Sequence, residues 1–151
     1  MQCSVHAPNQ FIHAHLDRLL PDWTEPALSV LIVLQPCCVS LEHQTPETEQ
    51  QKHNLRQTFL ELGQAVAAKL HQQGYLADVF DPKTGFPTLT QPGNLRLDDV
   101  RVAHACLGYA LDRSDKCTLI LHPKWGKAVY PAVLVSSAHP NVLWEIVSSM
   151  I

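Results

Sequence analysis

Residues 103–126, AHACLGYALDRSDKCTLILHPKWG, contain two apolar segments separated by the polar tetrapeptide at residues 112–115. We interpret them as the two strands of a hairpin, because apolar runs on either side of a short polar turn are typical of that motif. Cys117 follows the turn, so its thiol is expected close to solvent near the hairpin tip. A thiolate there is a soft ligand suited to a polarisable transition metal. The alternative is a small hydrophobic residue that begins a strand.

The expected four-residue turn also predicts the register of this hairpin. Leu111 would lie opposite Lys116, and Ala110 would lie opposite Cys117. Cys106 would then sit four residues along the partner strand, about 13 Å from Cys117 and too far for a disulfide. Charged residues of both signs surround the turn, so the direction of any shift in the thiol pKa stays open.

Outward from this stretch, helices and strands alternate along the chain. Apolar residues at helical spacing predict helices over residues 9–20, 46–73 and 140–150. Residues rich in branched side chains predict strands over 1–6, 27–35, 75–80 and 128–136, and residues 95–102 fit neither pattern. Because short turns join the late strands, we expect an α+β fold, with a mixed, largely antiparallel sheet and flanking helices. The length favours a single domain over residues 1–151.

Composition excludes several classes of protein. The formal net charge is −3 and lysines and arginines do not cluster, which argues against a nucleic-acid partner. We expect no membrane segment and no signal peptide, because no apolar run is long enough and the start is not basic. Five cysteines form no C-x-x-C pair, which indicates reduced thiols and a cytoplasmic location.

Catalytic and metal-binding motifs are also missing from the sequence. It has no G-x-S-x-G nucleophile motif and no glycine-rich phosphate loop. His104 and Cys106 would share one strand face, yet a structural zinc needs about four ligands and no second pair is near. Asp98 and Asp99 are neighbours, which is more typical of a solvated turn or helix start than of a catalytic pair. We expect no catalytic residues.

Several segments, taken together, resemble a known family. They are QCSVH at residues 2–6, LSVLIVLQ at 28–35, GYLADVFDP at 74–82, and the series Leu107-Gly108-Tyr109, Asp112, Cys117, His122 and Trp125-Gly126. In this order and spacing they resemble the C-terminal globular domain of the cblD-type cobalamin-trafficking family, MMADHC. The resemblance runs nearly end to end, although no single segment is diagnostic.

The resemblance implies a fold similar to that of the flavin nitroreductases, but modified and without flavin. It implies an adaptor or chaperone rather than an enzyme, in the intracellular metabolism of cobalamin (vitamin B12). The implied partner is a cblC-type cobalamin-processing protein (MMACHC), with delivery to methionine synthase or methylmalonyl-CoA mutase. No cofactor is expected on the isolated chain, because cobalamin is shared through the partner. A homodimer is a further option.

The resemblance also suggests site residues. A cysteine in the family's hairpin is implied to coordinate the cobalt of partner-bound cobalamin, which makes Cys117 the candidate metal contact. Tyr109, Asp112 and Trp125 are the candidate partner contacts. Vertebrate relatives have a Cys-Cys pair where this chain has Lys116 and Cys117, and neighbouring positions on a strand face opposite ways. The family's mitochondrial targeting extension has no counterpart before Met1, so we expect either a trimmed piece of a longer protein or a purely cytoplasmic form.

Two other classes of function remain as alternatives. A nitroreductase-like oxidoreductase would need backbone donors at a helix start, or clustered basic residues, to hold the flavin phosphate. Neither is evident in the sequence. A generic dimerisation module would use all five cysteines only as structural residues.

Overall fold

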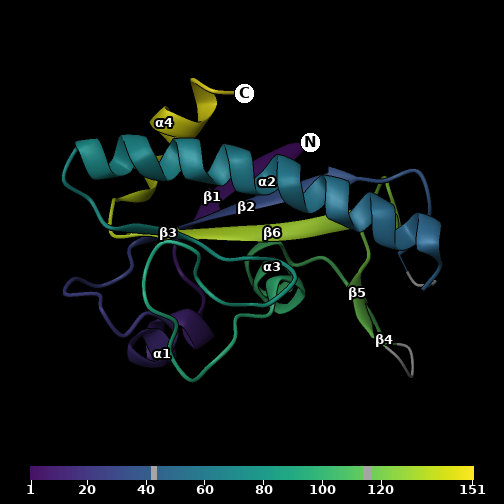
Figure 1. Ribbon diagram of the computed structural model, residues 1–151, viewed down its shortest axis with the longest axis horizontal. Coiled ribbons are helices and arrows are strands. Elements are labelled where there is room, and N and C mark those ends of the chain that lie inside the picture. Colours follow the sequence, from purple (N-terminus) through teal and green to yellow (C-terminus); the bar gives the residue numbers. More distant parts are fainter. Residues whose placement is uncertain (42–43, 114–116) are drawn as a thin grey trace.

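The computed structural model describes residues 1–41, 44–113 and 117–151. Its elements are, in order, β1 (Gln2–His6), α1 (Gln10–Leu19), β2 (Ser29–Pro36), α2 (Pro46–Gln72), β3 (Ala77–Val79), α3 (Asp99–Leu107), β4 (Leu111–Arg113), β5 (Thr118–Ile120), β6 (Val129–Ser136) and α4 (Pro140–Ser148). Four strands form one sheet in the order β1-β2-β6-β3, and β4 pairs with β5 apart from it. Figure 1 shows α2 and α4 on one side of the sheet and α1 and α3 on the other.

The expected α+β class is confirmed, but the sheet is not mixed. Each pairing between described strands is antiparallel, including both pairings of the central strand β6. The reason is that β6 runs between β2 and β3 in the direction opposite to both. The strands predicted over residues 1–6, 27–35, 75–80 and 128–136 and the three expected helices agree with the structure to within two residues at each end.

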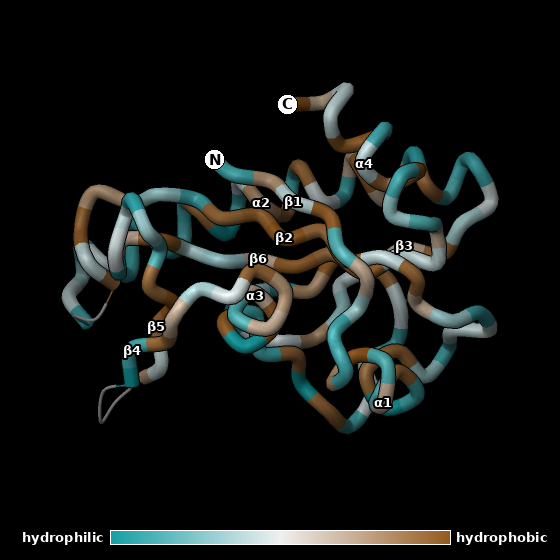
Figure 2. Tube along the Cα trace, turned by 180° about the vertical axis from the view of Figure 1, so that it is seen from behind, coloured by the Kyte–Doolittle hydropathy of each residue, from teal (hydrophilic) through white to brown (hydrophobic). Residues whose placement is uncertain are grey.

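The core lies on both faces of β2 and β6. These strands pair over eight residues, from Ser29 opposite Ser136 to Pro36 opposite Val129. The odd-numbered residues Leu31 and Val33 pack beneath α2 and α4, whereas even-numbered residues of β2 face the layer of α1 and α3. A continuous apolar run is what a strand covered on both faces requires. Figure 2 shows the hydrophobic colours gathered along these two strands.

The long helix α2 begins and packs as its sequence predicts. Thr45 accepts a hydrogen bond from the backbone N–H of Thr48 at 3.1 Å, and Pro46 stands in the first turn. Farther along, Gly63 lets the helix approach β3, since a Cβ there would lie 2.8 Å from Cγ1 of Val79. Within the described residues, no helix has the length and apolarity needed to cross a membrane.

The first half of the predicted hairpin is wrong, because residues 103–107 belong to α3. Asp98 caps this helix by accepting from the N–H groups of Val100 and Arg101, at 3.1 and 3.3 Å. Gly108, with φ of 74°, ends it in the left-handed conformation that glycine favours. The prediction that Asp98 stands at a helix start is therefore confirmed. His104 and Cys106 do not share a strand face, because residues two apart on a helix diverge.

The register of the remaining hairpin also differs from the prediction. Leu111 pairs with Ile120 rather than Lys116, and Arg113 pairs with Thr118. β4 therefore extends to Arg113, into the predicted turn at residues 112–115. Residues 114–116 lie outside the described part of the chain, so the expectations for Lys116 fall there too. The predicted pairing of Ala110 with Cys117 is wrong for the same reason, since Ala110 accepts a hydrogen bond from the N–H of Leu121. The predicted strand position of Cys106 is wrong because this residue belongs to α3.

Candidate functional site

An aromatic cluster lies beside the β4–β5 hairpin and brings together two of the predicted contact residues. The His122 ring stacks on Trp125 with centroids 4.2 Å apart and planes 15° apart. Tyr109 meets the same imidazole edge-on, at 5.3 Å between centroids and 76° between planes. Tyr109 and Trp125 are half-buried and His122 is buried, so the histidine is the centre of the cluster.

Two local features of the chain position these rings. Residues 122–126 form a closed turn, in which His122 and Gly126 exchange two backbone hydrogen bonds of 2.9 Å. Gly126 has φ of 58°, a conformation that residues with a Cβ rarely adopt, and Trp125 precedes it. Tyr109 follows Gly108, the residue that ends α3. A helix end and a tight turn thus deliver the two aromatic side chains to one histidine.

Hydrogen bonds fix the protonation state of His122. Its Nδ1 accepts from the backbone N–H groups of Lys124 and Trp125, at 3.0 and 3.1 Å. The proton therefore lies on Nε2, which donates to Oε1 of Gln2 at 2.8 Å. Burial, and secondarily the charge of Lys124, lowers the pKa of His122, which keeps the imidazole neutral.

Gln2 extends this network to the first strand. Its amide Nε2 donates to the Tyr109 hydroxyl at 3.2 Å, while its carbonyl accepts from His122. Because Gln2 belongs to β1, the cluster is joined to the edge of the main sheet. Gln2 and His122 were not expected as site residues. The H-x-x-W-G spacing could have indicated the turn, but no local signal links residues 2 and 122.

Asp112, the third predicted contact residue, is held by a different interaction. Its carboxylate lies 2.6 Å from Nζ of Lys127, and both side chains are about one-third exposed, at 33% and 35%. The pair joins β4 to the segment before β6. Asp112 itself lies on β4, three residues along the chain from Tyr109 of the aromatic cluster.

Cys117 precedes β5 directly and is half-buried. All five cysteines are thiols. Burial raises the pKa of Cys3, Cys37 and Cys106, so the thiolate is disfavoured at those three positions. Within the described ranges, no three His, Cys, Asp or Glu side chains gather as a metal site. Cys117 thus lies directly before β5, and its role as a metal ligand stays a prediction.

The fold and the site define a class of protein: a small α+β domain with a separate cysteine-bearing hairpin and a rigid histidine–aromatic cluster. The family described as methylmalonic aciduria and homocystinuria type D protein, MMADHC, matches residues 1–146. That match covers nearly the whole sequence. The chain belongs to the MMADHC family.

Curated relatives carry a consistent name. The chain is 23% identical over 141 residues to the cobalamin trafficking protein CblD of Gallus gallus, and equally to that of Homo sapiens. These alignments cover 93% of this chain and 48% of each relative. The CblD protein of Rattus norvegicus is 22% identical over 138 residues, covering 91% of this chain and 47% of the relative. The chain spans about half the length of the curated relatives it matches.

Proposed function

We propose that this domain acts in cobalamin trafficking as a non-catalytic adaptor that binds a cblC-type, MMACHC-like protein. Membership of the MMADHC family and relatives named cobalamin trafficking protein CblD support this role. In the proposal, the adaptor holds no cofactor alone and helps to route cobalamin to methionine synthase or methylmalonyl-CoA mutase. Its proposed location is the cytoplasm.

The observation that carries the mechanism is the position of Cys117. In our proposal its thiolate coordinates the cobalt of cobalamin held by the partner. The thiol is half-buried and adjoins the loop of a two-stranded hairpin that stands apart from the main sheet. Such a hairpin can reach into a partner's cavity while the core stays intact. A thiolate is a soft donor, which matches a polarisable metal.

The aromatic cluster is the proposed docking contact. Tyr109 and Trp125 are half-buried, so part of each ring remains available to a partner. Aromatic residues are enriched at protein interfaces, and rings fixed before binding lose little entropy on association. The stack on His122 provides that rigidity. Asp112 would add a charged contact at the rim by exchanging its Lys127 partner or sharing it.

The competing proposal is a flavin oxidoreductase, since the resemblance implies a modified nitroreductase-like fold. It makes a different prediction for the purified chain: a flavoprotein is yellow, with a visible absorption band, whereas the adaptor is colourless. A generic dimerisation module makes a third prediction, namely a homodimer indifferent to cobalamin. Absorption and sizing of the isolated chain therefore separate these classes.

Mixing experiments with the cblC-type protein of the same organism test the adaptor directly. We expect co-elution that cobalamin strengthens, together with a change in the visible spectrum of the bound corrinoid. Cys117→Ser should fold normally and abolish the spectral change. Cys38→Ser, which alters an exposed cysteine outside the β4–β5 hairpin, is the matched control. A mixed spectrum that is identical for the wild type and Cys117→Ser would remove Cys117 from the mechanism.

A further inference from the structure

A cavity of about 430 Å³ lies on the side of the sheet that carries α3. The first turn of α3, the turn at residues 81–85, the end of β5 and the start of β6 surround it. Much of its wall is apolar and comes from distant parts of the chain: Leu41, Leu97, Val100, Leu119, Ile120, Val129 and Pro131. Its size and its largely apolar lining are typical of small-molecule sites.

Two polar groups in the cavity wall have unused hydrogen-bonding capacity. Asp99 is 8% exposed, and its Oδ1 is buried without a partner among the described residues. The Tyr130 hydroxyl, contributed by β6, likewise forms no hydrogen bond with a residue that the structure describes. Leaving a buried polar group unpaired is costly, and natural proteins rarely do so without a reason. This cost applies to Asp99, since the Tyr130 side chain is only half-buried. A bound molecule would give both groups a partner.

The surroundings of these groups favour the uncharged form of both. Burial, reinforced by the carboxylates of Asp98 and Asp81, raises the pKa of Asp99 well above its usual range. Burial, followed by the nearby carboxyl groups of Asp99 and Asp81, also raises the pKa of Tyr130. The raised pKa favours the protonated carboxylic acid of Asp99, which can both donate and accept a hydrogen bond. In this uncharged form, the Asp99 carboxyl can bind a polar group of a ligand and does not repel a negative charge that the ligand carries at another position.

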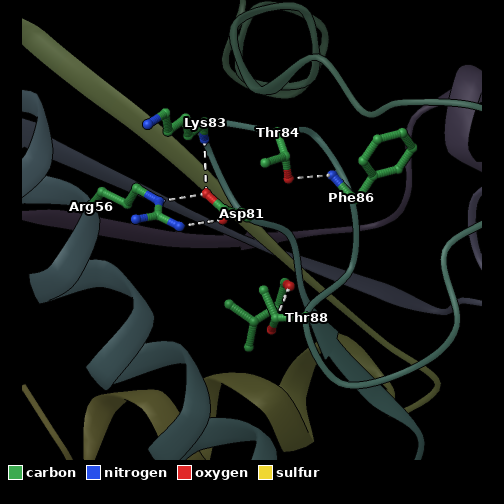
Figure 3. A network of polar contacts seen from close by, with 7 residues as sticks. Arg56, Asp81, Lys83, Thr84, Phe86 and Thr88 are labelled. Atoms are coloured by element: carbon green, nitrogen blue, oxygen red, sulfur yellow. Dashed lines mark hydrogen bonds and ion pairs between the residues drawn. The ribbon is translucent and has the colours of Figure 1, made fainter.

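The rim of the cavity is basic. Lys52, Lys83 and Arg96 line it, together with the carboxylate of Asp98, which lies 3.5 Å from Nε of Arg101. Arg56 is already neutralised by Asp81, which accepts from its Nε at 2.7 Å and from its Nη2 at 2.5 Å, as Figure 3 shows. Asp81 also accepts from the backbone N–H of Lys83 at 2.9 Å, which fixes the rim loop.

The lysines differ in how far they are already engaged. Lys52 lies 3.5 Å from Glu49, within its own helix. Lys83 is exposed and makes no ion pair with a described residue. Arg96 lies over the Phe86 ring, 5.3 Å from its centroid. The Lys83 ammonium, which has no such ring contact among the described residues, is the cation we assign to an incoming anion.

We propose that this cavity binds a small organic anion, independently of the proposed cobalamin role. Its apolar body fills the cavity, its anionic group lies against Lys83 at the rim, and its hydrogen-bonding group reaches Asp99 and Tyr130. The arrangement places one charge at the mouth and one polar anchor inside, with apolar contacts between. No chemical step is required of the site.

The dye 1-anilinonaphthalene-8-sulfonate is a suitable probe, because it carries an aromatic body, an N–H donor and a sulfonate. Fluorescence titration should give one saturable site on the wild-type chain. Lys83→Gln should weaken dye binding by about threefold or more, as expected for loss of one accessible ion pair. Tyr130→Phe should weaken it also, with no change in the far-ultraviolet circular dichroism.

Two controls make the result specific. Lys69→Gln removes an exposed lysine from the other end of α2 and should leave dye affinity unchanged. The uncharged analogue N-phenyl-1-naphthylamine lacks the sulfonate, so its binding should respond to Tyr130→Phe but not to Lys83→Gln. Equal effects of Lys83→Gln and Lys69→Gln on dye binding would overturn the proposal.

Amide chemical shifts on adding the dye locate the site without any substitution. The expected shifts fall at residues 82–85, 97–100, 119–120 and 129–131. Shifts confined instead to the surroundings of the exposed Trp144 would show adventitious binding to a surface patch and would overturn the proposal. Absence of saturable binding would do the same.

Discussion

The His122 imidazole both stacks on the Trp125 indole, with centroids 4.2 Å apart, and accepts a hydrogen bond from the Trp125 backbone N–H. One residue thus fixes the plane of the indole and the turn that carries it. The same imidazole donates from its other nitrogen to Gln2. Protonation of Nδ1 would remove the acceptor for two N–H groups, so the cluster depends on a neutral histidine.

The first prediction is a loss of stability in mild acid. The pKa of His122 is lowered in the folded chain from an ordinary value of 6.5. As the pH falls below that value, the unfolded state takes up the proton first, and the free energy of unfolding decreases until the folded pKa is passed. Urea denaturation at about pH 7.5 and about pH 5.5 measures this difference.

The variant His122→Gln should show a smaller decrease in stability over the same range, because it lacks the titrating group. Burial lowers the pKa of His6 as well, so part of the dependence should remain. His13→Gln, at an exposed position, should retain the full wild-type dependence. An unaltered pH slope in His122→Gln would show that the cluster does not couple to protonation.

A second prediction concerns the link between β1 and the cluster. Gln2→Ala should lower the free energy of unfolding by about 1–3 kcal/mol, because the part-buried Nε2–H of His122 and the Tyr109 hydroxyl lose their shared partner. Urea denaturation measures the change. Gln64→Ala, on the exposed face of α2, should cost nothing and can stabilise the helix slightly. Equal stability of both variants would mean that the bridge contributes nothing.

Local patterns predicted the long elements well. Three features could be recognised from residues close together in the sequence. They are the apolar stripe of α2, its Thr45 cap and the continuous apolar run of β2. The helix α3 was missed because its nine residues carry only a short apolar face. The Asp98 cap and Gly108 were nevertheless visible as start and stop signals. Because residues 103–107 were predicted as a strand, the predicted position of Cys106 was wrong.

The candidate site depends on contacts that no local pattern contains. Tyr109 and Trp125 could be named from resemblance, but their meeting at His122 requires a helix end and a turn to converge. Gln2 joins them from 120 positions away along the chain. The hairpin register was missed because its polar segment is longer than the turn itself, so several pairings fit equally well.

The close approach of α2 and β3 gives a third prediction. Gly63→Ala gains about 1 kcal/mol of helix propensity. Its new Cβ, however, would lie 2.8 Å from Cγ1 of Val79, which is fully buried and cannot move freely. Overpacking of this kind costs about 1–3 kcal/mol. We therefore expect a net loss of stability in urea denaturation.

Removing the obstructing methyl groups should reverse the penalty. In a Val79→Ala background, Gly63→Ala should become stabilising, since only the helix-propensity gain remains. A double-mutant cycle measures this coupling. If Gly63→Ala instead stabilises the otherwise wild-type chain, α2 and β3 can move apart at little cost.

The last prediction is that Asp99→Asn stabilises the chain. The buried Asp99 carboxyl has a raised pKa, so the folded state holds its proton more tightly than the unfolded state does. Wild-type stability therefore decreases as the pH rises above the ordinary aspartate value of 3.8 and through the raised folded pKa. The amide does not titrate, so Asp99→Asn should be more stable near neutral pH by about 1–3 kcal/mol. Its advantage in thermal and urea denaturation should shrink towards about pH 4, where the carboxyl of both states approaches neutrality.

Asp98→Asn, which retains an oxygen able to cap α3 and is exposed, should change stability little. An Asp99→Asn variant with wild-type stability at every pH would mean that the carboxyl carries no desolvation cost in the fold.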